Sequence, residues 1–136
     1  MTLKASALKV GDSYSERVVD NLSRTQIVQY AGSSGDYNPL HSDEVYTTQV
    51  AGYPSVFAHG MLTMGLTGKM LTNYVGDGTL TKFGVRFTNQ VWPGDTLDST
   101  ATVKSVGGGL VELDVETKNQ DGVVVVSGYA EARVDP

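Results

Sequence analysis

The second half of the chain alternates between apolar and polar residues. Four stretches show the alternation: 83–91, 97–104, 111–116 and 124–134. A period of two is typical of strands that bury one face. Glycine-containing turns separate these stretches at 93–95, 107–109 and 121–122. Connected strands with one polar face predict an antiparallel sheet that is covered on one side.

The longest predicted helix runs from about His59 to Val75 and ends at a glycine-rich break, 76–78. It is apolar on most sides, which predicts a buried helix. The apolar residues are Met61, Leu62, Met64, Leu66, Met70 and Leu71. The helix also contains Gly60, Gly65 and Gly68, and a glycine costs up to about 1 kcal/mol relative to alanine. Three such residues predict close backbone approach by a curved sheet wrapped round the helix.

The first half predicts a strand at 13–20 and two short helices. Ser23 and Gln26 form a capping-box pattern at the start of the first helix. We expect this helix to end at Gly32 or Gly35. Ser42 is predicted to begin the second helix and Gly52 to end it. Without a repeat or linker, the pattern indicates one α+β domain over residues 1–136.

Composition narrows the function classes. Net charge is −5 and the ten basic residues are scattered, so the basic face expected of a nucleic-acid-binding protein is missing. The longest purely apolar run, 123–126, is far shorter than a membrane-spanning helix. No signal-peptide pattern opens the sequence, which favours a cytoplasmic protein. Cysteine is absent, which excludes disulfides, thiolate–zinc sites and cysteine nucleophiles in this chain.

The two histidines lie in the two most distinctive motifs. In the first, Gly35, Asn38 and Pro39 predict a tight loop that brings Asp36 and His41 onto one side. A carboxylate and an imidazole that converge can bind and deprotonate a water molecule. Alternatively, Asp36 forms only an Asx-turn and His41 packs or caps.

The second motif, His59-Gly60, opens the long helix. The first backbone N–H groups of a helix lack partners and carry partial positive charge, and a glycine lets a substrate oxygen approach them. Gly60 is therefore a candidate oxyanion site. Alternatively, Gly60 serves packing and His59 is a buried histidine with satisfied hydrogen bonds.

The strings SGDYNPLH and FAHGMLTMG, and the later VRFTNQVWPGDTL, resemble the MaoC-like, (R)-specific enoyl-CoA hydratase family over residues 25–135. The resemblance implies a hot dog fold, a curved antiparallel sheet round one long helix. It also implies that Asp36 and His41 hold the water that attacks C3 of a trans-2-enoyl thioester. Gly60 N–H would bind the thioester carbonyl, with Asn38 and His59 as further substrate-binding or orienting residues.

We expect neither a cofactor nor a metal. The resemblance implies that the substrate is an acyl thioester of coenzyme A or of an acyl carrier protein. The expected assembly is a homodimer, or a heterodimer with another hot dog subunit. Phe83, Phe87 and Trp92 are candidates for the acyl tunnel or the interface, although core packing fits the phenylalanines too. The chain departs from the family pattern at Thr47 and at Asn89-Gln90, and the second departure concerns the acyl pocket.

Three other interpretations stay open. Hot dog thioesterases share the architecture, usually with a carboxylate placed elsewhere. A non-catalytic hot dog subunit would shape a partner's tunnel, although this chain has the complete motif. Asp36, His41 and His59 also match a facial metal triad in residue type.

Overall fold

Five antiparallel strands form one sheet in the computed structural model, which describes all residues from 1 to 136. The strands are β1 (Ser13–Val19), β2 (Leu80–Phe87), β3 (Leu97–Gly107), β4 (Leu110–Lys118) and β5 (Val124–Arg133). Their order is β1-β3-β4-β5-β2, so β3 to β5 form the predicted meander, and β1 and β2 are the edges. The predicted antiparallel sheet is confirmed.

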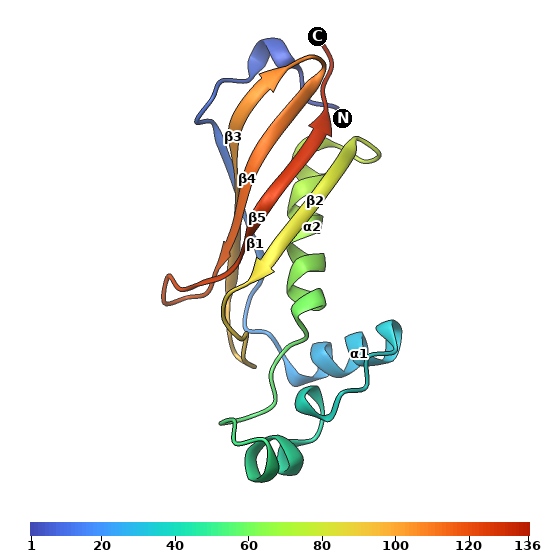
Figure 1. Ribbon diagram of the computed structural model, residues 1–136, viewed down its shortest axis with the longest axis vertical. Coiled ribbons are helices and arrows are strands. Elements are labelled where there is room, and N and C mark those ends of the chain that lie inside the picture. The colour runs from blue at the N-terminus through green and yellow to red at the C-terminus, as the bar shows by residue number, and fades with distance from the viewer.

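Helix α2 (Gly60–Val75) lies along one face of this sheet (Figure 1). Its buried residues face the strands: Thr63, Thr67, Met70, Leu71 and Val75. The predicted burial of this helix is only partial in the single chain, because the sheet covers one side of it. Met61 is 55% exposed, and Gly65 and Lys69 are exposed on the same stripe. None of the helices has the length and apolar character needed to cross a bilayer.

The glycines of α2 meet aromatic side chains of β2. A Cβ on Gly60 would lie 3.0 Å from the Phe87 ring, and one on Gly68 would lie 3.2 Å from the Phe83 ring. Close approach is therefore confirmed at these two positions, although the neighbour is a side chain. At Gly65 the prediction is wrong, since no atom lies within 4 Å of such a Cβ.

Strand β2 ends four residues earlier than its alternation predicts. Beyond Phe87, the side chains of Thr88 and Asn89 both donate to the Val124 carbonyl, at 2.6 and 2.8 Å. The Thr88 N–H still donates to the Val125 carbonyl at 3.0 Å, and beyond it the segment to Val91 leaves the sheet. Phe87, the last residue of this edge strand, is 51% exposed.

Residues 20–59, between β1 and α2, form a separate lobe beyond one end of the sheet, opposite the two termini (Figure 1). Helix α1 (Arg24–Ser34) has the predicted capping box at Ser23 and ends at Gly35, which is left-handed with φ 75°. A 3-10 turn (Pro39–His41) and a π-helical segment (Tyr46–Val50) follow. Ser42 does not cap this second helix. Asp43 does so, because its carboxylate accepts from the Tyr46 N–H at 3.0 Å.

Candidate active site

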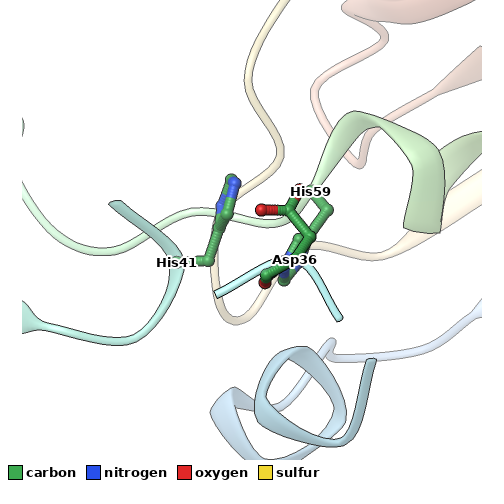
Figure 2. Close-up of side chains that lie close together, drawn as sticks. All are labelled: Asp36, His41 and His59. Carbon is green, nitrogen blue, oxygen red and sulfur yellow. The ribbon is translucent and has the colours of Figure 1, made fainter. Parts of the chain in front are cut away.

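The loop after α1 carries the first motif and folds as two successive side-chain turns. The Asp36 carboxylate accepts from the Asn38 N–H at 3.3 Å, and the Asn38 side-chain oxygen accepts from the Leu40 N–H at 3.0 Å. The Asx-turn is thus present. It also sets Asp36 beside His41, with His59 from the second motif completing the group (Figure 2). One carboxylate or ring atom from each of the three lies within 4.8 Å of the others.

His41 is buried, and its ring is held in one tautomer. Its Nδ1 lies 2.6 Å from the Phe57 carbonyl oxygen, which can only accept, so Nδ1 carries the hydrogen. Nε2 then keeps its lone pair. Burial lowers the pKa of His41 below its ordinary value, and this outweighs the opposing effects of the Phe57 carbonyl and Asp36. The ring is therefore neutral near pH 7 and equipped to accept a proton.

His59 anchors the two motifs to each other. Its Nε2 donates to the Asp36 main-chain oxygen at 3.0 Å, and its ring stacks on His41 with centroids 3.8 Å apart. The edge of Tyr30 packs against it as well, at 4.9 Å. Although the residue is only 2% exposed, its Nδ1 has no hydrogen-bond partner. The interpretation of a buried, fully satisfied histidine thus holds for one ring nitrogen only.

Gly60 lines a pocket of about 280 Å³ at the start of α2. The other lining residues are Phe57, Ala58, Thr63, Phe87, Thr88, Asn89, Gln90, Val91, Val125 and Val126. The Gly60 N–H makes no backbone hydrogen bond within the chain, as expected for the first residue of a helix. Asp36, His41 and His59 lie outside the lining and adjoin it through residues 57–60. Asn38 is likewise absent from the lining, so its contact with substrate stays a prediction.

Two residues that hold His41 in place were not predicted from the sequence. Phe57 does so with its backbone carbonyl, which every residue type has, so no sequence signal identifies it. Thr47 is fully buried, and its hydroxyl lies 3.0 Å from the Pro39 carbonyl and 2.7 Å from that of Asp43. The departure from the family pattern at Thr47 therefore supports the loop.

Asp36, His41 and His59 also supply the donor types of a metal site. However, Nδ1 of His41 and Nε2 of His59 both face backbone carbonyls. The two rings are stacked with only 24° between their planes, so the lone pairs left on the other nitrogens lie in two nearly parallel planes. A metal ion held at about 2.0–2.1 Å by both rings would need those lone pairs to converge. The geometry suits proton transfer better than metal ligation.

Comparison with known proteins identifies the family. The sequence profile described as MaoC like domain matches residues 5–125. Over 134 residues the chain is 35% identical to a 3-hydroxyacyl-thioester dehydratase of Mycobacterium tuberculosis, which covers 96% of this chain and 43% of the relative. An enoyl-CoA hydratase of the same organism is 38% identical over 97 residues, 69% of this chain and 32% of the relative. The chain thus spans less than half the length of these relatives.

A solved structure supports the same family assignment. The unliganded R-hydratase of Pseudomonas aeruginosa superposes with a TM-score of 0.87 and 28% identity, covering 98% of this chain and 86% of that one. The chain therefore belongs to the MaoC-like domain family and has the hot dog fold that its motifs predict.

Proposed function

We propose that this chain is a hydro-lyase that adds water across the C2–C3 bond of trans-2-enoyl thioesters in fatty-acyl metabolism and catalyses the reverse dehydration, with an (R)-3-hydroxyacyl thioester as the hydrated form. The carrier is coenzyme A or an acyl carrier protein. The observation that carries the proposal is the neutral His41, with a free Nε2 lone pair, beside the Asp36 carboxylate and next to an apolar pocket. The family membership supports it.

In the proposed mechanism, Asp36 and His41 hold one water molecule. Nε2 of His41 takes a proton from this water as its oxygen bonds to C3, and a proton is returned to C2. Negative charge develops on the thioester oxygen as the enolate forms. The Gly60 N–H has no backbone partner and lies at the positive end of α2, which supports a role in stabilising that charge.

Purified protein mixed with crotonyl-CoA tests the proposal. Loss of enoyl absorbance without free thiol is the expected result. Release of thiol would instead identify a thioesterase. Protein that is inactive alone but active with a co-expressed hot dog subunit would support the heterodimer alternative. Inactivity on enoyl thioesters of both carriers, with and without such a partner, would contradict the proposed function.

The pH dependence of turnover follows from His41. Because burial holds the pKa of His41 below its ordinary value of 6.5, the neutral base is present down to that pH. We expect kcat/KM for hydration to stay level from about pH 8 to pH 6.5 and to fall only at lower pH. A profile that already declines between about pH 8 and 7 on acidification would contradict a depressed pKa.

The same shift affects stability. The unfolded chain protonates His41 at a higher pH than the folded chain does. The stability due to neutral His41 is therefore complete above pH 6.5 and is lost as the pH falls through the folded pKa. Unfolding of His41→Gln should depend less on pH in this acid range than unfolding of the wild-type protein.

We also propose that the chain dimerises through β2. This strand is a sheet edge, and edge strands leave backbone hydrogen-bonding groups unpaired. Phe87 on β2 and Met61 on α2 are half-exposed apolar side chains. Pairing of two β2 edges would cover them and join two sheets. A homodimer is the simplest form, and a heterodimer with another hot dog subunit is the alternative.

Sedimentation at micromolar concentration should show a dimer, and Phe87→Asp should weaken it. Val28→Asp is the matched control, since Val28 is 54% exposed on α1, away from this edge. A fully active monomer would contradict the dimer proposal.

A further inference from the structure

A cluster of hydroxyl groups lies in the core between α2 and the sheet. Thr67 of α2, Ser99 of β3 and Thr117 of β4 are each 0% exposed. The Thr117 oxygen lies 2.7 Å from that of Thr67 and 2.6 Å from that of Ser99. Thr67 also donates to the Thr63 carbonyl at 2.9 Å. All three hydroxyls are hydrogen-bonded, and the cluster has no place in the mechanism above.

The cluster lies directly behind two residues of the pocket lining. Thr63 and Val126 are lining residues of the pocket. Thr67 lies one helical turn beyond Thr63, and Thr117 is the sheet partner of Val126. A chain that extended past the pocket along α2 would therefore meet bonded hydroxyl groups instead of an apolar tunnel.

The volume of the pocket also limits the length of the acyl chain that it can hold. A water-sized group takes up roughly 30 Å³, so about 280 Å³ holds about nine such groups. The carbonyl oxygen, the sulfur and about six acyl carbons make up about eight. Further carbons would have to displace Thr63 or separate the hydroxyls behind it, leaving polar groups unpaired in the core.

We infer that this chain selects short acyl thioesters, of about four to six carbons, and that Thr63 with the hydroxyl cluster sets the limit. The inference rests on the proposed function and names the substrate class of the same site. Each methylene that a pocket buries contributes about 0.8 kcal/mol, or about fourfold in kcat/KM. This gain should stop at about six carbons here.

The test is a panel of trans-2-enoyl-CoA substrates with four, six, eight and ten carbons. For wild-type protein we expect the highest kcat/KM at four to six carbons and a value at least tenfold lower at ten. Thr63→Ala removes the end wall without touching a member of the cluster, and should raise the eight-to-four-carbon ratio about tenfold. Thr63→Ser keeps the hydroxyl, and Thr72→Ala lies on the half-exposed side of the same helix, so both should leave the ratio nearly unchanged.

The outcomes distinguish a failure of the chain-length inference from a failure of the proposed hydratase function. Hydration that is fastest at ten carbons, or a Thr63→Ala variant that alters all lengths equally, would overturn the inference and leave the hydratase proposal standing. Hydration of no substrate in the panel would overturn both. If the variants fail to fold, the dependence of wild-type kcat/KM on acyl chain length tests the inference by itself.

Discussion

Replacing His41 with alanine is expected to lower kcat for hydration by about 10²–10⁴, because a general acid–base group typically contributes that much. Asp36→Asn should lose a comparable amount, since it keeps the shape of the side chain and removes its charge. The two single variants and the double variant would be assayed on crotonyl-CoA. The double variant should be little worse than either single, because the two residues act on one water molecule.

The controls separate chemistry from folding. Asp36 is exposed and His41 forms a single hydrogen bond in the core, so thermal unfolding should show that both variants fold. Asp77→Asn removes an exposed carboxylate just beyond the far end of α2 and should leave kcat unchanged. Near-normal turnover by His41→Ala would rule out the proposed mechanism.

Local signals in the sequence predicted most of the fold. The capping box at Ser23, the left-handed Gly35 and the glycine turns each depend on a few neighbouring residues, and all occur as predicted. The convergence of Asp36 and His41 also depends on a short loop with strong turn residues. Sequence reasoning could therefore place both side chains together before any tertiary contact was known.

What could not be predicted depends on distant contacts. Strand β2 ends at Phe87, where two side chains bond a carbonyl near the start of β5, although the alternation continues past that point. The exposed side of α2 reflects how much of it one sheet covers, which its apolar composition does not reveal. The tautomer of His41 is set by the Phe57 carbonyl, a group without a sequence signature.

Gly60→Val is expected to lower kcat/KM by about 10²–10³, the loss typical of removing one oxyanion donor. The added side chain would lie between the first turn of α2 and an incoming thioester oxygen. It would also crowd the Phe87 ring, which is 3.0 Å from the Cβ position. Activity on crotonyl-CoA, with circular dichroism to confirm folding, measures the effect.

The matched control for crowding is Gly68→Val. It would press on the Phe83 ring in the same way, at 3.2 Å, about two turns farther from the helix start. If it lowers kcat/KM as much as Gly60→Val does, the loss arises from packing between α2 and β2 and the oxyanion role is wrong. His59→Gln should cost less than tenfold, because glutamine can still donate a hydrogen bond to the Asp36 carbonyl. A loss equal to that of His41→Ala would instead place the unpartnered Nδ1 of His59 in the chemistry, and the water would then have three protein partners.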